Sequence, residues 1–272
     1  MGDAVRRVAA LAAARNIELI LPEEEQRKHG QAVAGARWQP GEGDGADLCV
    51  VLGGDGTTLR ALDRFLGRDT PVFAINFGRV GFLTTAAPAA LEPALGRAFE
   101  GDYTVVELPA IEVRRDGTRI GVAVNDAVVT SAIHGRMAHF RFRVRGVDLG
   151  EVGCDAMVVA TPSGSTAYSL SAGGPVLSWG LDGVCITFVA PHSLTARSLV
   201  LPRGQLVEIE NHGAGTDARL VLDGHVVADA LEPLSVVAVR MAEEHANLAL
   251  LPEVSFLQRY RDVFGSGLGV GG

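Results

Sequence analysis

The segment Val50-Val-Leu-Gly-Gly-Asp-Gly-Thr-Thr-Leu59 sets three glycines around one aspartate directly after an apolar run. A helix that starts there exposes unpaired N–H groups, and glycines without a Cβ atom let a phosphate reach the backbone. A carboxylate beside a bound polyphosphate repels it unless a metal ion or a transferable proton lies between them. The sequence therefore predicts that Asp55 is either a ligand to Mg²⁺ or the acceptor of a proton from an attacking hydroxyl. The alternative is a helix N-cap in a tight turn.

A second group of small and hydroxyl-bearing residues follows an apolar strand at residues 155–160. It reads Thr161-Pro-Ser-Gly-Ser-Thr-Ala-Tyr-Ser-Leu-Ser-Ala-Gly-Gly-Pro175. Ser and Thr supply short hydrogen-bonding groups, while Gly and Ala leave room for a bulky ligand. The turn at 53–56 is not a G-x-G-x-x-G motif, and the chain contains no G-x-x-x-x-G-K-[ST] or G-x-S-x-G motif, so neither a Walker A loop nor a serine nucleophile is indicated.

The elements around the first segment alternate between strands and helices. Short apolar runs predict strands at residues 17–21, 47–52 and 71–75, and helical periodicity predicts helices at residues 4–15, 57–66 and 91–100. This order is typical of a doubly wound α/β domain with a parallel sheet.

After about residue 101 the pattern changes to alternation with period two, which predicts a mainly β domain. Asp116-Gly117 is a hairpin signal, and an amphipathic helix at residues 255–264 is expected to return to the first domain. The strands are expected at residues 105–106, 111–114, 121–129, 140–147, 184–189, 206–210, 219–222 and 234–240.

Net charge and the numbers of cysteine and lysine residues indicate which partners and which compartment suit the protein. The formal net charge of −8 argues against a nucleic-acid or membrane-surface partner. The three cysteines form no C-x-x-C pair, and the start of the chain lacks the layout of a signal peptide, which together predict a reduced, cytoplasmic protein. Lys28 is the only lysine, so a phosphate bound in the glycine-rich loops depends on Mg²⁺ and backbone N–H groups.

The chain resembles the NAD kinases, which use ATP or inorganic polyphosphate. The resemblance covers about residues 47–260. A G-G-D-G-T turn alone also occurs in diacylglycerol kinases, sphingosine kinases and phosphofructokinases, whereas the long second segment is specific. The matching motifs are Gly53-Gly-Asp-Gly-Thr57, Asn76-Phe-Gly-Arg-Val-Gly-Phe-Leu83, Asn125-Asp126, the segment 161–175, Pro191-His-Ser-Leu194 and Leu222-Asp-Gly-His225.

The resemblance implies that Asp55 takes the proton from the 2′-hydroxyl of the adenosine ribose of NAD, so that phosphoryl transfer gives NADP. It implies that Asp155 holds the nicotinamide side, that Tyr168 lies near the adenine, and that Asn125 and Asp126 hydrogen-bond the dinucleotide. The implied contacts are Asp55, Gly56, Phe82, Asn125, Asp126, Arg136, Asp155, Thr166, Ala167, Tyr168, Ser169, Leu170, Ser171 and His225.

The implied organisation is an α/β phosphate-donor-binding domain at 1–100, an all-β, sandwich-like NAD-binding domain at 101–252, a helix at 253–265 that returns to the first domain, and a disordered tail at 266–272. The implied requirements are NAD, ATP or polyphosphate, and Mg²⁺ or another divalent cation, with no protein metal ligand assigned. A homodimer or homotetramer is expected, with no nucleic-acid or membrane partner.

Three departures from the family pattern stand out. Asn125-Asp126 replaces the usual Asn-Glu, and Asp155-Ala156 replaces the usual Asp-Gly. Gly153 stands where some relatives have arginine, which favours acceptance of NADH as well as NAD. The family's first strand has no counterpart before the first helix, which indicates a truncated start or a sheet without that edge strand.

Two other functions compete with this interpretation. A lipid kinase could use the same Gly-Asp turn, but the polar 161–175 segment does not suit acyl chains. A non-catalytic dinucleotide sensor would have no use for Asp55.

Overall fold

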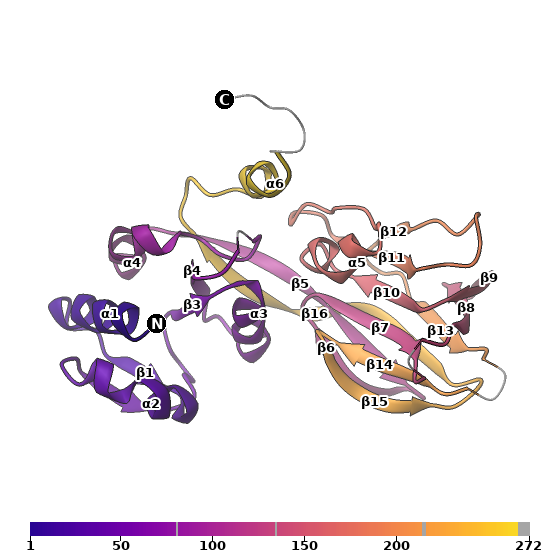
Figure 1. Ribbon diagram of the computed structural model, residues 1–272, viewed down its shortest axis with the longest axis horizontal. Helices are drawn as coiled ribbons and strands as arrows, with labels where there is room; N and C mark the ends of the chain where they lie inside the picture. Colours follow the sequence, from indigo (N-terminus) through magenta and orange to yellow (C-terminus); the bar gives the residue numbers. More distant parts are fainter. Residues whose placement is uncertain (80, 134, 214–215, 266–272) are drawn as a thin grey trace. The chain divides into compact units, whose positions relative to one another are not determined.

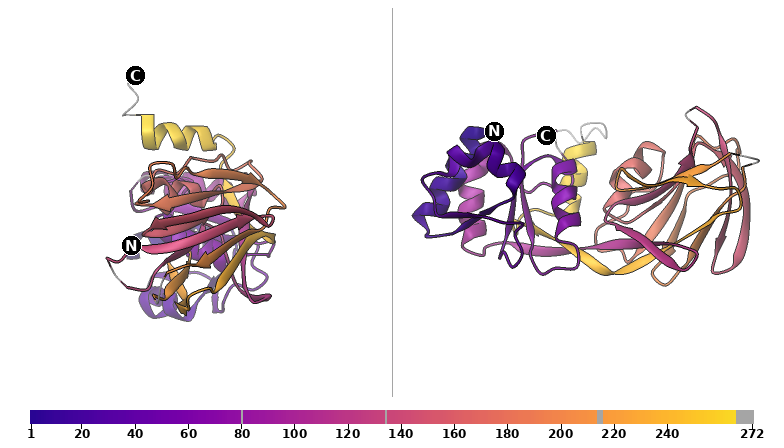
Figure 2. Two further views of the ribbon diagram at one scale, coloured as in Figure 1. Left: turned by 90° about the vertical axis from the view of Figure 1, so that its right-hand side faces the viewer. Right: turned by 90° about the horizontal axis from the view of Figure 1, so that it is seen from below.

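The computed structural model describes residues 1–79, 81–133, 135–213 and 216–265, and the tail predicted to be disordered lies outside them. The chain divides into unit 1, Met1–Glu107 with Asn247–Gly272, and unit 2, Leu108–Ala246. Both boundaries fall within long strands, β5 (Thr104–Arg115) and β16 (Val236–Leu250), which are visible in Figure 2. The mixed α/β architecture predicted from the sequence is confirmed.

Unit 1 is built on parallel strands that carry the Asp55 loop. β3 (Cys49–Gly53) pairs in parallel with β4 (Val72–Asn76), and the end of β16 pairs in parallel with β4 (Figure 1). β1 (Leu19–Leu21) and β2 (Trp38–Pro40) form a separate two-stranded sheet. The helical elements are α1 (Gly2–Ala14), α2 (Glu23–His29), η1 (Gly30–Val33), α3 (Asp55–Arg64), η2 (Pro88–Ala90), α4 (Leu91–Phe99) and α6 (Phe256–Phe264).

The core of unit 1 joins helices to this sheet. Phe73 and Ile75 of β4 are fully buried with Leu91 and Leu95 of α4. The near-continuous apolar character of β4 follows from burial of a parallel strand on both faces. This packing holds the ends of β3 and β4 side by side.

Unit 2 contains antiparallel sheets. One has the strand order β12-β11-β10-β7-β14-β15; in the other, β16 pairs with β13, β13 with β8 and β8 with β9, while β5 pairs with β6. The elements are β6 (Thr118–Ala123), β7 (Asp126–Ser131), β8 (Ala138–Val144), β9 (Val147–Cys154), β10 (Ala156–Ala160), η3 (Gly164–Thr166), α5 (Tyr168–Ser171), β11 (Gly183–Val189), β12 (Leu199–Pro202), β13 (Val207–Asn211), β14 (Ala218–Leu222) and β15 (His225–Leu231).

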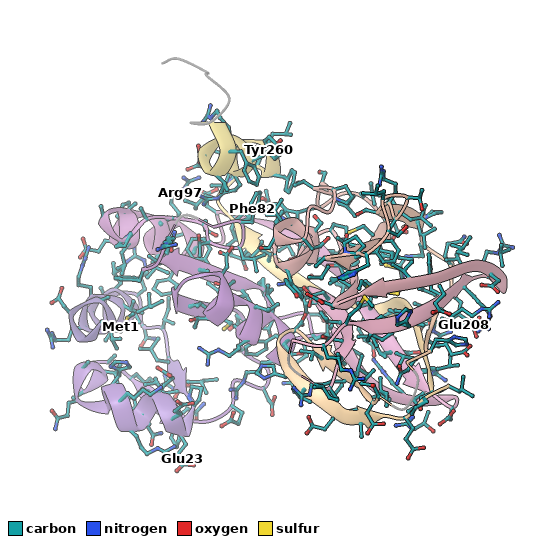
Figure 3. All side chains as sticks on the ribbon, turned by 45° about the vertical axis from the view of Figure 1, so that its right-hand side comes forward. Met1, Glu23, Phe82, Arg97, Glu208 and Tyr260 are labelled. Atoms are coloured by element: carbon teal, nitrogen blue, oxygen red, sulfur yellow. The ribbon has the colours of Figure 1, made fainter. Side chains whose placement is uncertain are left out.

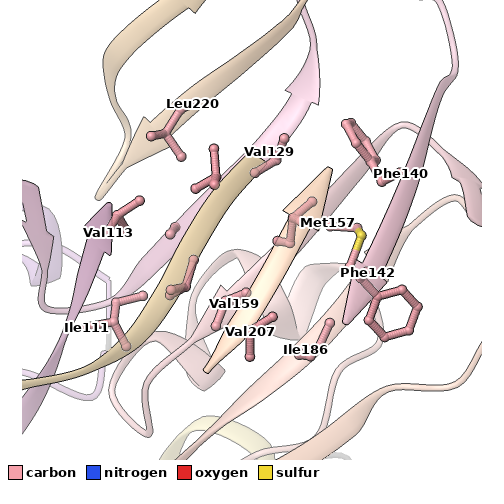
Figure 4. Close-up of a cluster of buried hydrophobic side chains, with 14 of the residues drawn as sticks. Ile111, Val113, Val129, Phe140, Phe142, Met157, Val159, Ile186, Val207 and Leu220 are labelled. Atoms are coloured by element: carbon pink, nitrogen blue, oxygen red, sulfur yellow. The ribbon is translucent and has the colours of Figure 1, made fainter. Parts of the chain in front are cut away.

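The core of unit 2 is mainly aliphatic, as the low aromatic content indicates. Met157, Val159 and Ile186 from one sheet pack in one cluster with Phe140 and Val207 from the other (Figure 4). This cluster fixes the strand ends from which the 161–171 segment departs.

Two predicted strands and one predicted helix boundary are wrong. The strand expected at 121–129 is broken between β6 and β7, because the backbone at 124–126 turns toward Asp223. The strand expected at 140–147 ends at Val144, where Arg145 and Gly146 have positive φ values of 51° and 74° and form a hairpin. The helix expected from residue 57 begins at Asp55.

Candidate active site

Asp55 is the first residue of α3, directly beyond the carboxyl end of β3. Its carboxylate is held by two backbone amides from a different loop. The Phe82 N–H donates to Asp55 Oδ2 at 2.8 Å, and the Leu83 N–H donates to Oδ1 at 3.1 Å. Hydrogen bonds from two amides to one ionised carboxylate fix its orientation more firmly than neutral hydrogen bonds would. The acid is thus held in one defined position.

The glycines around Asp55 allow this close packing. A Cβ atom on Gly81 would lie well under 3.0 Å from the Asp55 carboxylate, a distance that real Cβ atoms essentially never show. A Cβ atom on Gly53 would lie 2.8 Å from the Thr57 side chain, and one on Gly78 would lie 3.5 Å from the Gly54 Cα atom. Glycine is therefore required at positions 53 and 81, whereas a side chain at position 78 would make only an ordinary contact.

Opposing effects act on the Asp55 carboxyl. Burial raises its pKa above the ordinary value of 3.8, while the two amide N–H groups and the positive charge of Arg259 act in the other direction. The net result is a raised pKa. A carboxylate with a raised pKa is a stronger base than an exposed aspartate.

Phe82, which bonds to Asp55 through its N–H, and Gly56, which follows Asp55 in the chain, differ in exposure. The Phe82 side chain is only 4 % exposed, and its ring centroid lies 5.7 Å from that of Phe256 and 5.9 Å from that of Phe264, both on α6. Figure 3 shows Phe82 beside the helix that carries Tyr260. Gly56, in the first turn of α3, is exposed. The loop end therefore combines an anchored aromatic residue with an accessible glycine.

In unit 2, residues 124–126 form a tight turn, called here the 124–126 turn, around the carboxylate of Asp223. The amides of Val124, Asn125 and Asp126 donate to the Asp223 oxygens at 2.7, 2.8 and 3.0 Å. Three amides converging on one anion make a rigid turn. This turn ends β6 and starts β7, and it places Asn125 and Asp126 at a strand junction.

The hydroxyl-rich segment packs against the same turn. The Thr161 Oγ1 donates to the Val124 carbonyl at 2.6 Å, and the Ser163 Oγ donates to Asn125 Oδ1 at 2.9 Å. A Cβ atom on Gly164 would collide with the Asn125 backbone carbonyl. Asn125 is therefore fixed by both neighbouring segments, and its side-chain amide nitrogen is the group still suited to a ligand acceptor.

Asp126 has an unusual charge state. Burial, and secondarily the negative charge of Asp223, raise its pKa from 3.8 to about 7. A carboxyl with this pKa is about half protonated at neutral pH, so it can donate as well as accept a hydrogen bond.

The rest of the 161–171 segment alternates between anchored and accessible residues. Ser169 is fully buried, and its Oγ lies 2.8 Å from Thr187 Oγ1. Thr166 Oγ1 donates to the Ser163 carbonyl at 2.9 Å. Tyr168 is 43 % exposed, Ser171 is exposed, and Ala167 and Leu170 are half-buried.

The other three residues expected at the site are all exposed in unit 2. Asp155 lies between β9 and β10, where the Thr130 Oγ1 donates to its carbonyl at 2.9 Å. His225 begins β15, and Arg136 lies in the loop before β8. Asn125 and Asp126 thus lie in the turn that packs against the 161–171 segment, whereas Asp155, His225 and Arg136 lie at other exposed positions of unit 2.

Reasoning from the sequence missed four residues that shape these sites: Gly81, Gly164, Asp223 and Arg259. Gly81 and Gly164 lie within quoted motifs, and Asp223 lies within Leu222-Asp-Gly-His225, so their motifs were visible but their contacts were not. No sequence signal marked Arg259.

The described residues were compared with what a metal site and a membrane-spanning helix require. They contain no group of three or more His, Cys, Asp or Glu side chains that could hold a metal ion. They also contain no helix with the length and apolar character needed to cross a membrane.

Comparison with known proteins gives matches over both units. The model of the ATP-NAD kinase N-terminal domain matches residues 6–103, and that of the ATP-NAD kinase C-terminal domain matches residues 124–251. The NAD kinase of Heliobacterium modesticaldum is 39 % identical over 220 residues, which cover 79 % of this chain and 77 % of that protein. The NAD kinase of Aromatoleum aromaticum is 37 % identical over 238 residues, covering 85 % and 78 %.

Two solved structures are similar in fold. The NAD kinase from Archaeoglobus fulgidus in complex with ATP is 27 % identical with a TM-score of 0.70, covering 93 % of this chain and 99 % of that one. Yeast NADH kinase complexed with NADH is 22 % identical with a TM-score of 0.82, covering 98 % and 85 %, and at this identity it shows the fold alone.

Proposed function

The chain belongs to the NAD kinase family, and on that premise we propose that it transfers a phosphoryl group from ATP to the 2′-hydroxyl of the adenosine ribose of NAD, producing NADP. The observation that carries the assignment is the Asp55 carboxylate, held by two amides at the start of α3. Ligands in parallel α/β sheets bind beyond the carboxyl ends of the strands, and Asp55 lies at such an end.

Asp55 acts as the base of this reaction. Each of its oxygens accepts one amide N–H and keeps a further lone pair for the proton of the ribose hydroxyl. Its raised pKa makes it a better proton acceptor, and the amides prevent the carboxylate from rotating. Phosphoryl transfer depends largely on such positioning, because the protein has little covalent chemistry to perform.

The dinucleotide is held by the 124–126 turn and the 161–171 segment of unit 2. The buried hydroxyls of Thr161, Ser163 and Ser169 bond within the protein, so they shape the segment and leave accessible residues to touch NAD. Tyr168 is one of these, and its exposed ring is suited to stacking on an adenine. Gly153, two residues before Asp155, leaves the nicotinamide side without an arginine, which favours NADH as a second acceptor.

Mg²⁺ fits this site only as a companion of the donor. Because the described residues offer no group of three or more metal-ligating side chains, the ion would be held mainly by ATP phosphates. Bound there, it would neutralise negative charge on the phosphates. The residues of this chain orient the acceptor hydroxyl and take up its proton.

We further propose a homodimer or homotetramer located in the cytoplasm. β9 is an edge strand of its sheet, and it exposes Val147 at 62 % and Leu149 at 44 %, an apolar edge that a second copy could cover. The cysteines Cys49, Cys154 and Cys185 are free, which suits a reducing compartment.

The assignment is tested by incubating the protein with Mg²⁺, ATP and either NAD, NADH or diacylglycerol. We expect NADP from NAD, and phosphorylation of diacylglycerol alone would favour the lipid kinase instead. Asp55→Ala should retain NAD binding in a calorimetric titration and lose NADP formation, whereas Asp69→Ala, which changes an exposed acid of the same unit, should leave turnover unchanged. Normal turnover by Asp55→Ala would refute the role of this residue, and wild-type binding of NAD without turnover would indicate a sensor.

A further inference from the structure

α6 is attached firmly to the loop that holds Asp55. A capping box fixes its start: the Gln258 N–H donates to Ser255 Oγ at 3.3 Å, and the Ser255 N–H donates to Gln258 Oε1 at 2.8 Å. Phe256 and Phe264 then pack on the Phe82 ring at 5.7 and 5.9 Å. One face of α6 is therefore turned toward the segment whose amides bind Asp55.

Arg259 lies on that face and bonds to the other end of the same segment. Its Nη2 donates to the Thr85 carbonyl at 2.6 Å. Thr85 is itself tied to the sheet, because its N–H donates to the Ala74 carbonyl at 2.7 Å and its Oγ1 donates to the Ala249 carbonyl at 2.9 Å. Arg259 thus bonds to a fixed point only two residues beyond Leu83, whose amide donates to Asp55.

One donor of the Arg259 guanidinium, the Nε atom, is buried and has no hydrogen-bond partner. Burying a charged donor without a partner lowers the stability of the fold. Buried polar groups that lack a hydrogen-bond partner are exceptions in folded proteins, and such exceptions are expected mostly at functional sites. The position of Arg259 is better explained by its action on Asp55 than by any gain in stability.

We propose that Arg259 is a positioning residue of the active site, which holds the segment 82–85 around Asp55 and places a permanent positive charge beside the carboxylate. The proposal rests on the role of Asp55 as the base. It assigns α6, which reaches the site from the far end of the chain, a part in the chemistry as well as in the fold.

The charges that act on this pair are few. The positive charge of Arg259 lowers the pKa of Asp55 against the dominant effect of burial, and among the described residues no other charged side chain contributes to this shift. Burial lowers the pKa of Arg259, while Asp262 and Asp55 raise it. A guanidinium stays protonated at any pH used for assay, so it acts on Asp55 as a constant charge. Removing that charge must make Asp55 harder to ionise.

The test is the pH dependence of kcat for the wild type, Arg259→Gln and Arg259→Lys, with NAD and ATP saturating. NADP formation by the base requires ionised Asp55, so kcat rises with pH through the pKa of this group. In Arg259→Gln the acid limb should move to higher pH by about one unit, an approximately tenfold loss of kcat on that limb, with partial recovery at high pH. Arg259→Lys should keep the limb near its wild-type position. Arg261→Gln, on the exposed side of α6, is the matched control.

An acid limb of Arg259→Gln that coincides with the wild-type limb would overturn the proposal, and so would an equal shift in Arg259→Lys. If Arg259→Gln does not fold, Arg259→Met, which keeps a long unbranched side chain without its charge, carries the test. Its limb should also move to higher pH, and an unmoved limb would contradict the proposal. Absence of NADP formation by the wild type would instead refute the proposed function.

Discussion

Gly81→Ala is expected to separate catalysis from folding. The new Cβ atom would lie well under 3.0 Å from the Asp55 carboxylate, whereas ordinary contact begins at 3.4 Å. The obstructing atoms belong to the end of a flexible side chain, so the carboxylate can withdraw by about 1 Å without movement of the backbone. The fold should therefore survive, while the carboxylate loses its hydrogen bonds to the Phe82 and Leu83 amides.

The size of the effect follows from the lost geometry. Asp55 accepts amides at 2.8 and 3.1 Å, and hydrogen bonds to a charged group are worth about 1.5–3 kcal/mol each. The withdrawn carboxylate gains hydration in exchange, so we expect a loss of about 1–2 kcal/mol in the free energy of unfolding. A catalytic group displaced by about 1 Å costs about 100-fold in rate, so kcat should fall by about that factor.

The assay is steady-state NADP formation at saturating NAD and ATP, combined with urea unfolding and calorimetric NAD binding. Gly78→Ala is the matched control, because its Cβ atom would make only ordinary contacts, with the Gly54 Cα atom at 3.5 Å and Asn76 Oδ1 at 3.6 Å, and kcat should stay near the wild-type value. A folded Gly81→Ala enzyme with kcat within threefold of the wild type would show that the Phe82 and Leu83 amides do not position the base.

Two further predictions concern unit 2. Gly164→Ala would push a Cβ atom into the Asn125 backbone carbonyl, which is held in place by the turn. We therefore expect Tm to fall by several degrees and the affinity for NAD to fall at least tenfold. Unchanged values in thermal unfolding and NAD titration would contradict this. Asp126 has a folded pKa of about 7 against an ordinary 3.8, so its ionisation destabilises the fold increasingly from about pH 4 to pH 7. Asp126→Asn should therefore stabilise more at pH 8 than at pH 5, by about 2 kcal/mol in urea unfolding, and equal gains at both pH values would refute the argument.

Local patterns in the sequence predicted elements whose causes are local. The apolar run before Gly53 predicted β3, and the Asp116-Gly117 pair predicted the hairpin between β5 and β6, where φ is 50° and 77°. The amphipathic pattern at 255–264 predicted α6 and its return to the first domain. For each of these elements the sequence signal lies within a few residues, although the return of α6 is made by distant contacts with Phe82.

Features that depend on distant contacts could not be read in this way. The break between β6 and β7 exists because Asp223, almost a hundred residues away, takes the amides of the 124–126 turn. Asp55 could be proposed as an acid because its glycines flank it, but the Phe82 and Leu83 amides that hold it come from another loop. Arg259 reaches the site only after α6 has folded back, so its own neighbours in the sequence carry no signal of its position.

Asp55 and Asp126 show how one chain gives two buried aspartates different proton affinities. Burial raises the pKa of both. At Asp55 burial is the largest effect, and two amides and the charge of Arg259 oppose it, so the pKa is raised less than burial alone would raise it. At Asp126 nothing comparable opposes burial, and the negative charge of Asp223 adds to it, so the acid is half protonated near pH 7 and suited to donate a hydrogen bond. The Asp223 carboxylate that orders the 124–126 turn thus also adds to the effect of burial on Asp126, whereas the amides that hold Asp55 act against burial, so the two aspartates differ in proton affinity because of their neighbours.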